Sequence, residues 1–323
     1  MSLDLDTVRA FVRVAELASF TRAAEQLGVP KARVSQQVRR LEGDVGGRLL
    51  HRTTRAVRLT PDGERFLARA RRLLLEAEDL GGMFLGANAL RGRVRVDLPM
   101  GLARNAVIPA LPGLLGRHPL LDLQLSTTDR LIDVVREGFD CVVRVGALGD
   151  SGLVAIRLGE LEMINCASAD YLRAHGTPTT LADLDAHRLV HYSASLGSDL
   201  PELEYHDGAR YRVRAMKAAL TVNNADAFGA ACRAGLGIIQ VPRNGVAPWL
   251  ASGELVEILP ALRAPPLAVH LLHPHGRDVP RRIRVVLDWL DATLRHHLGG
   301  KRERQGKRSP TKAPLEKVRS PVA

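Results

Sequence analysis

The chain has 323 residues, of which 46% are hydrophobic and 4% aromatic, and it carries a formal net charge of +11 at pH 7. This length and apolar content allow two or three domains, each with its own core. The low aromatic content argues against a single-stranded nucleic-acid binder, which stacks bases on aromatic rings. No run approaches the roughly 18 to 20 apolar residues that span a bilayer. The acidic start at residues 1–6 lacks a hydrophobic stretch and predicts a soluble, cytoplasmic protein without a secretory signal.

The positive charge lies at the two ends of the chain. Residues 1–60 carry 11 Lys and Arg against 6 Asp and Glu, residues 61–300 carry 27 of each kind, and residues 301–323 carry 8 against 2. Attraction to phosphates must therefore come from the ends, and double-stranded DNA is the favoured partner. The tail at 301–323 is rich in Lys, Arg, Pro and Ser and is predicted to be disordered. It either adds salt-sensitive attraction to DNA or only keeps the protein soluble.

Residues 18–42 predict two helices packed at an angle, the helix-turn-helix unit that places its second helix in the DNA major groove. A Leu-Gly-Val turn at residues 27–29 separates the helices. At about 100° per residue, three apolar side chains of the second helix share one narrow arc. These are Val34, Val38 and Leu41, which are expected to face Phe20, Ala23, Ala24 and Leu27 of the first helix.

The opposite face of the second helix is the candidate DNA-reading surface. Near the helix start, Arg or Lys can donate to guanine, Gln can pair with adenine and Ala can meet a thymine methyl group. Cationic side chains further along are expected to hold phosphates. The alternative is an ordinary solvated, charged helix face. The predicted DNA-binding residues here are Lys31, Ala32, Arg33, Ser35, Gln36, Arg39 and Arg40.

Residues 49–60 alternate Leu and Val with Thr and Arg, which predicts a short two-stranded hairpin. Beside a recognition helix, such a basic wing can touch the flanking minor groove, where the negative potential favours Arg. Arg52 and Arg55 are the candidates for this contact. The alternative is an exposed hairpin whose arginines only keep it soluble.

A long helix is predicted from residue 61 to about residue 88. One stripe of it repeats with alternating spacings of four and three residues, the a/d pattern of a helix that pairs with a second copy. Dimerisation would place two recognition helices on a two-fold-related DNA site. The alternative is that the stripe packs on the chain's own DNA-binding domain. The predicted dimerisation residues are Phe66, Ala70, Leu73, Ala77, Leu80 and Phe84.

From residue 91 the pattern changes to short strands alternating with helices. A βαβαβ order predicts a doubly wound, parallel α/β sheet that binds ligands at the carboxyl ends of its strands. A second such unit begins near residue 162, so a cleft between two lobes is expected. The predicted strands are 94–98, 121–126, 141–145, 162–166, 219–222, 237–242 and 267–273, and the predicted helices are 103–115, 130–137, 224–234 and 280–297.

No metal site, cofactor site or catalytic constellation is predicted. Cys141, Cys166 and Cys232 are far apart and lack metal-ligand spacing, so buried, inert thiols are favoured over a redox pair. The chain has no HExxH, P-loop or GxSxG motif, and Gly235-Leu236-Gly237 lacks the third glycine of a dinucleotide-binding turn. The chain is therefore not expected to be an enzyme.

Residues 3–298 resemble the LysR-type transcriptional regulators. The matching segments are residues 19–24, 27–29, 34–42, 52–55, 59–63, 129–133, 138–146 and 234–238. The resemblance implies a winged helix-turn-helix at residues 1–60, a dimerising linker helix at 61–90 and a periplasmic-binding-protein-like effector domain at 91–300. In this domain, lobe I is expected at about 91–163 and 268–300, and lobe II at about 164–267. It also implies a homodimer or homotetramer that regulates a promoter in response to a small metabolite, with RNA polymerase as a further candidate partner.

The resemblance also places the effector between the two lobes. Helix N-termini and nearby hydroxyl groups suit a carboxylate, so a small organic anion is expected. The alternatives are that the Ser, Thr and Asn residues only cap helices and that Arg144 serves an internal ion pair. The predicted effector-binding residues are Pro99, Met100, Gly101, Leu102, Ser126, Thr127, Thr128, Arg144, Asn223 and Asn224.

Two other functions share part of this pattern. A solute-binding transport protein has the same two-lobed fold, but it is expected to carry a signal peptide and no basic helix-turn-helix. A purely architectural DNA binder would have no use for about 200 residues of neutral α/β domain. A ligand-responsive, sequence-specific DNA-binding regulator is therefore the favoured interpretation.

Overall fold

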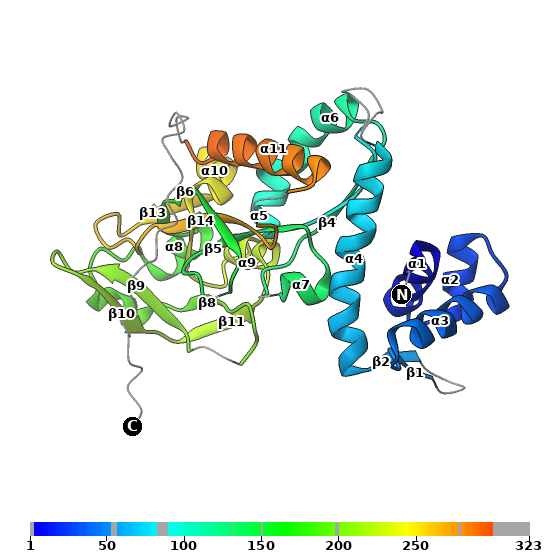
Figure 1. Cartoon of the computed structure of the whole chain (residues 1–323). Helices are drawn as coiled ribbons and strands as arrows, with labels where there is room; N and C mark the ends of the chain where they lie inside the picture. Colours follow the sequence, from blue (N-terminus) through cyan, green and yellow to red (C-terminus); the bar gives the residue numbers. More distant parts are fainter. Residues whose placement is uncertain are drawn as a thin grey trace.

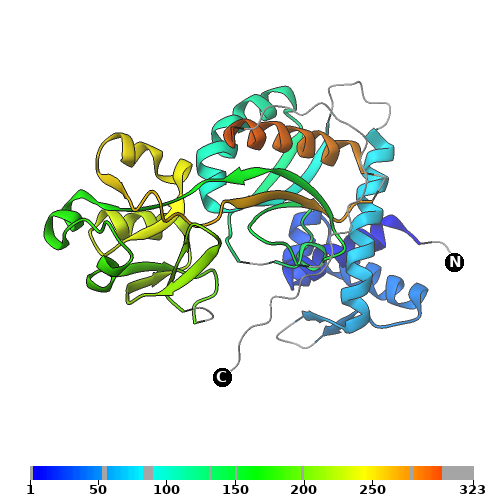
Figure 2. The same ribbon diagram turned by 90° about the vertical axis from the view of Figure 1, so that its left-hand side faces the viewer.

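The computed structural model describes residues 3–52, 57–82, 90–130, 132–149, 151–197, 200–276 and 279–299. An N-terminal helical domain lies on one side of the long helix α4, and a larger α/β body lies on the other side (Figure 1). In the body, two lobes lie next to each other and are joined by extended segments (Figure 2). No described helix has both the length and the apolar run that crossing a membrane requires.

The N-terminal domain packs three helices and a hairpin around one core. The boundaries follow from local capping: the Ser19 side chain accepts the Arg22 backbone N–H at the start of α2, and Gly28, with φ 66°, ends it in the left-handed conformation. Val34, Val38 and Leu41 of α3 are fully buried, as predicted. The helices are α1 (Leu5–Leu17), α2 (Phe20–Leu27) and α3 (Lys31–Val45).

The wing is an antiparallel hairpin of β1 (Leu50–Arg52) and β2 (Val57–Leu59), which confirms the two-stranded prediction. It is tied to the next helix by Thr60. The Thr60 backbone N–H donates to the Leu49 carbonyl at 3.0 Å, and its hydroxyl accepts the Gly63 backbone N–H at 2.9 Å. Helix α4 (Pro61–Gly82) therefore leaves the wing in a fixed direction.

Lobe I is built on a five-stranded sheet with the order β4-β3-β5-β14-β6. β3 pairs parallel with β4 and β5, but β14 pairs antiparallel with β5 and β6. The prediction of an all-parallel sheet is therefore wrong for half of this sheet. The strands are β3 (Gly92–Asp97), β4 (Leu121–Ser126), β5 (Cys141–Val145), β6 (Val154–Leu161) and β14 (Leu267–His273).

The helices of lobe I differ from the predicted ones in two places. The predicted helix 103–115 is one rod with a π-helical turn, because Pro109 has no N–H to continue the ladder. The predicted helix 130–137 is confined to its last turn. The elements are α5 (Met100–Leu102), the π-helix η1 (Ala103–Val107), α6 (Ile108–Arg117), α7 (Val134–Glu137) and α11 (Arg281–His297).

Lobe II is also mixed, with a three-stranded sheet of order β12-β7-β13 in which both outer strands run antiparallel to β7. β11 and β8 form a parallel pair and β9 and β10 a hairpin. The elements are β7 (Met163–Ser168), α8 (Ala169–His175), the 3-10 helix η2 (Ala182–Ala186), β8 (Leu189–Tyr192), β9 (Glu202–His206), β10 (Tyr211–Ala215), β11 (Ala218–Val222), α9 (Ala225–Arg233), β12 (Ile239–Pro242), α10 (Arg243–Ala251) and β13 (Leu255–Ile258).

The chain crosses between the lobes twice. It leaves lobe I between β6 and β7, at Glu162, and returns between β13 and β14, along residues 259–266. Two short connections of this kind let the lobes move as units about a hinge.

Candidate functional site

The predicted DNA-reading face of α3 lies on the outside of the N-terminal domain. Ser35 is half-buried, and the other predicted side chains are exposed. Within the described part of the chain, Lys31, Arg33 and Arg39 make no ion pair. The exposed residues are Lys31, Ala32, Arg33, Gln36, Arg39 and Arg40.

Arg40 differs from its neighbours because it lies beside two carboxylates. Its guanidinium is 3.7 Å from Asp4 and 4.0 Å from Asp44, although the side chain is 64% exposed. These carboxylates offset part of its charge, so Arg39 is the stronger candidate for a phosphate contact on this turn.

The wing offers a cation that the sequence analysis missed. His51 and Arg58 face each other across the hairpin, and both are exposed. Arg58 therefore joins the candidate wing contacts, and the alternation of the strand could have identified it. Arg55 and the side chain of Arg52 lie outside the described residues.

The predicted dimerisation stripe divides into two halves. Ala70 is only 3% exposed within the core of its own domain, and the Phe66 ring packs edge-on against Phe11 with ring centroids 5.5 Å apart. The prediction that Ala70 faces a partner is wrong, because α1 already covers this part of α4, whereas Phe66 packs on α1 but is only half-buried. Further along, Leu73 is 38% and Leu80 66% exposed, and Ala77 is half-buried. Phe84 lies outside the described residues.

A cavity of about 370 Å³ lies between the lobes. Half of the predicted effector-binding residues line it: Pro99, Gly101, Leu102, Thr128 and Arg144. The other half, which do not line it, are Met100, Ser126, Thr127, Asn223 and Asn224. Asn224 instead caps α9 by accepting the Ala227 backbone N–H at 2.8 Å, the alternative that its residue type allowed.

Arg144 has the internal ion pair that the sequence analysis left open. Its Nη1 lies 2.8 Å from Asp97 Oδ2 and also donates to the Val143 carbonyl. Asp97 is fully buried, and the Arg144 side chain is 11% exposed. Nη2 of Arg144 is buried without a hydrogen-bond partner among the described residues.

Three polar contacts join the lobes across the cavity. Arg104 of η1 is paired with Asp226 of α9, and Asn244 Nδ2 of α10 donates to His297 Nε2 of α11 at 2.9 Å. Tyr192 of β8 faces Asp129, and burial together with this carboxylate raises the pKa of the Tyr192 phenol. Burial and the nearby His296 lower the pKa of His297, which suits a neutral ring that accepts a hydrogen bond.

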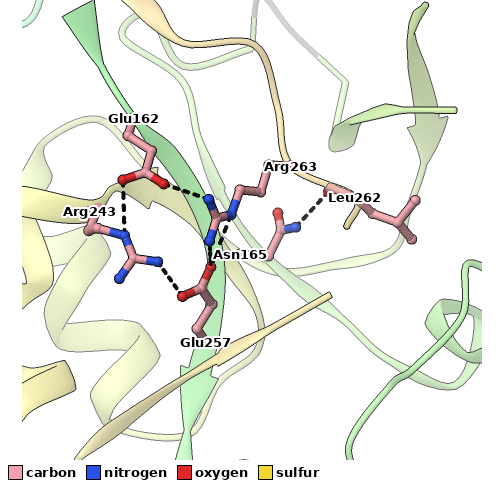
Figure 3. Close-up of polar contacts among 6 residues, drawn as sticks. All are labelled: Glu162, Asn165, Arg243, Glu257, Leu262 and Arg263. Carbon is pink, nitrogen blue, oxygen red and sulfur yellow. Dashed lines mark hydrogen bonds and ion pairs between the residues drawn. The ribbon is translucent and has the colours of Figure 1, made fainter. Parts of the chain in front are cut away.

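A closed ring of four charges joins the two crossing segments, at Glu162 and Arg263, to Arg243 of α10 and Glu257 of β13 (Figure 3). Arg243 contacts Glu162 at 3.1 Å and is paired with Glu257. Arg263 contacts Glu162 at 2.5 Å and Glu257 at 2.6 Å. Burial alone would raise the pKa of Glu257, but hydrogen bonds from Arg263 and Arg243 lower it below its ordinary value. Both crossings are thus tied together at the hinge.

Helix α4 also contacts lobe I directly. Gly138, with φ 72°, lies so close to Arg71 that a Cβ there would come within 2.6 Å of Nη1. Arg71 reaches Glu16 of α1 at 3.2 Å, so one side chain connects the N-terminal domain, α4 and lobe I.

The described residues contain no group of three or more His, Cys, Asp or Glu side chains placed to hold a metal ion. All three cysteines are buried and unpaired. Burial raises the pKa of the Cys141 thiol, which keeps it in the unreactive protonated form at neutral pH.

Comparisons with known proteins agree with this architecture. The family model for the bacterial regulatory helix-turn-helix protein, lysR family, matches residues 5–64, and that for the LysR substrate binding domain matches residues 87–295. The HTH-type transcriptional regulator YhjC of Escherichia coli, described as uncharacterised, is 40% identical over 297 residues, which cover 91% of this chain and 99% of the relative. The HTH-type transcriptional repressor PA14_22550 of Pseudomonas aeruginosa is 35% identical over 287 residues, which cover 88% of this chain and 90% of the relative.

Solved structures give the same result. CrgA, a LysR-type transcriptional regulator from Neisseria meningitidis, superposes with a TM-score of 0.58 at 29% identity, covering 91% of this chain and 99% of that one. The matches span both the helix-turn-helix and the two-lobed domain, which decides against a solute-binding transport protein. The chain belongs to the LysR family of bacterial transcriptional regulators.

Proposed function

We propose that this regulator reads double-stranded DNA with the exposed face of α3 and the wing, and that an effector bound between its lobes changes that activity. The main observation in favour of DNA binding is that α3 has one buried apolar face and one exposed polar face. Its three apolar side chains are fully buried, while Lys31, Arg33 and Gln36 are exposed, and neither of the two cations has an ion-pair partner among the described residues. A helix N-terminus with this chemistry fits the major groove.

We also propose a homodimer or homotetramer that acts in the cytoplasm, with no enzymatic activity. The exposed half of the α4 stripe, at Leu73, Ala77 and Leu80, supports the dimer because an isolated helix would leave these side chains in water. A promoter-bound dimer has RNA polymerase as its natural further partner, and the Arg71 contact with lobe I supports transmission of the effector signal.

Removing single DNA-reading side chains tests this function. The affinity of the full-length chain is measured by fluorescence anisotropy on a chromosomal fragment selected by binding and on a scrambled fragment of equal length. Arg33→Ala and Gln36→Ala should each weaken binding to the selected fragment by about 1–3 kcal/mol, because each base contact contributes on that order. Binding to the scrambled fragment should change less, because phosphate contacts dominate it.

The matched control is Arg173→Ala, which removes the same charge from α8 of lobe II, where the side chain is 77% exposed. Its affinity for the selected fragment should stay within about twofold of the unaltered chain, since the exposed pair of Arg173 with Asp170 contributes little. An equal loss in Arg173→Ala and Arg33→Ala would contradict a specific role for α3.

A further inference from the structure

We infer that the effector has a ring-sized apolar body and an oxygen acceptor, and that it carries at most one negative charge. This inference rests on the proposed role of the cavity between the lobes. The sequence suggested a small organic anion, and this inference restricts that class further: it excludes compounds with two or more carboxylates or phosphates.

The apolar body is required by the wall of the cavity. Phe228 and Trp249 line the cavity on the lobe II side, and Leu161, Met163 and Leu267 line it where the chain crosses between the lobes. The indole of Trp249 packs close against Gly229, where a Cβ would lie 2.8 Å from the ring. The guanidinium of Arg233 lies over the same ring at 5.0 Å. The indole is thus held in place and offers a preformed apolar surface, on which a flat ring gains most by leaving water.

The charge limit follows from the pairing of the lining cations. Arg144 is paired with Asp97 and Arg104 with Asp226, while Asp129 has the phenol of Tyr192 as its one partner among the described residues. Counting these five charged groups, the described site carries one net negative charge. His297 does not alter this count, because its Nε2 accepts a hydrogen bond from Asn244. A dianion would enter the site without a surplus cation to offset its desolvation, which is strongly unfavourable.

The unpartnered Nη2 of Arg144 indicates that the effector carries an oxygen acceptor. This amino group is buried in a residue that lines the cavity, and it has no hydrogen-bond partner among the described residues. An unsatisfied buried donor costs stability, so an acceptor from the effector, or water in its absence, is expected there. Nη1 is already engaged by Asp97, which leaves the two N–H groups of Nη2 for an oxygen acceptor: a carbonyl, a hydroxyl or a carboxylate oxygen. The cavity volume of about 370 Å³ lies near the lower end of ligand sites, which suits one ring and a short chain.

Three probes that share one two-carbon arm test this effector class: 3-phenylpropanamide, 3-phenylpropanoate and butanedioate, in which a second carboxylate replaces the ring. The chain has two tryptophans, Trp249 and Trp289, so the full-length Trp289→Phe variant reports through the cavity residue alone. Both phenyl compounds should change its emission saturably. Butanedioate should bind at least tenfold more weakly than 3-phenylpropanoate. Equal or tighter binding of butanedioate, or no saturation with either phenyl compound up to 10 mM, would overturn the inference.

A substitution at Arg144 tests the acceptor contact. Arg144→Lys keeps the charge beside Asp97 but removes the second amino group, and it should weaken both phenyl probes by roughly 10- to 100-fold, as expected for a hydrogen bond to a charged donor. The control Arg157→Lys lies on β6 outside the cavity, with a side chain 62% exposed, and should leave both affinities unchanged. Equal affinities in Arg144→Lys and Arg157→Lys would contradict the contact.

DNA affinity of the same proteins, measured without probes, separates the two levels of the proposal. If the unaltered chain binds DNA specifically but prefers butanedioate to the phenyl probes, only the inferred effector class is contradicted. If the unaltered chain does not bind DNA specifically, the proposed function itself is contradicted.

Discussion

Replacing Gly63 by alanine is expected to destabilise the N-terminal domain by about 3 kcal/mol, at the upper end of the cost of overpacking. Gly63 lies in the first turn of α4, where a Cβ would come within 2.0 Å of the Leu49 carbonyl oxygen and 3.1 Å of the Leu59 side chain. The obstacle is mainly backbone, so it cannot swing aside as a flexible side chain would. The same Leu49 oxygen accepts the Thr60 N–H that fixes the wing on α4, so the variant should also lose specific DNA binding.

The control for this substitution is Gly43→Ala. Gly43 lies inside α3, and a Cβ there meets no atom within 4 Å. Alanine should therefore stabilise the helix by about 0.5–1 kcal/mol. Differential scanning calorimetry of the full-length chain should show the transition of the N-terminal domain at lower temperature in Gly63→Ala and at higher temperature in Gly43→Ala. An unchanged transition in Gly63→Ala would mean that α4 does not pack as closely against the Leu49 carbonyl oxygen as the structure shows.

Replacing Arg144 by methionine is expected to destabilise the two-lobed domain by about 3 kcal/mol. Methionine conserves much of the side-chain volume but leaves the carboxylate of Asp97, which is fully buried, without its ion-pair partner. Removing one partner of a buried pair costs far more than the pair itself contributes, because the remaining charge is left desolvated. Denaturant unfolding followed by tryptophan fluorescence measures this loss, since both tryptophans lie in this domain.

Two further variants separate this explanation from a simple packing defect. Arg104→Met removes the other lining arginine, whose pair with Asp226 is 40% and 50% exposed, and should cost less than about 1 kcal/mol. The double variant Arg144→Met with Asp97→Leu should recover part of the lost stability, because no charge then remains buried. If the double variant is no more stable than Arg144→Met, desolvation of Asp97 is not the cause.

Local patterns in the sequence correctly predicted the features that depend on the spacing of neighbouring residues. The spacing of Val34, Val38 and Leu41 correctly predicted which face of α3 is buried. The strands at 121–126, 141–145 and 267–273 have the predicted bounds, because each is a compact apolar or alternating run.

The remaining features depend on contacts between distant segments. β6 was missed because it lies at the sheet edge with several exposed residues, and its pairing with β14 joins residues more than 100 positions apart. The cavity wall at Trp249 was missed because Gly245 and Pro248 conceal the helical pattern of α10. The apolar stripe of α4 could not reveal that its first half packs on α1, since self-packing and dimerisation produce the same spacing.

Site-specific photo-crosslinking can show whether the exposed face of α3 contacts the bases of DNA. A benzophenone amino acid is placed at position 36 on α3 or, as a control, at position 173 on α8, and the protein is irradiated on its selected DNA fragment. We expect a crosslink to bases from position 36 and none from position 173. Crosslinks from position 173 but not from position 36, on a fragment that the protein binds specifically, would contradict this expectation.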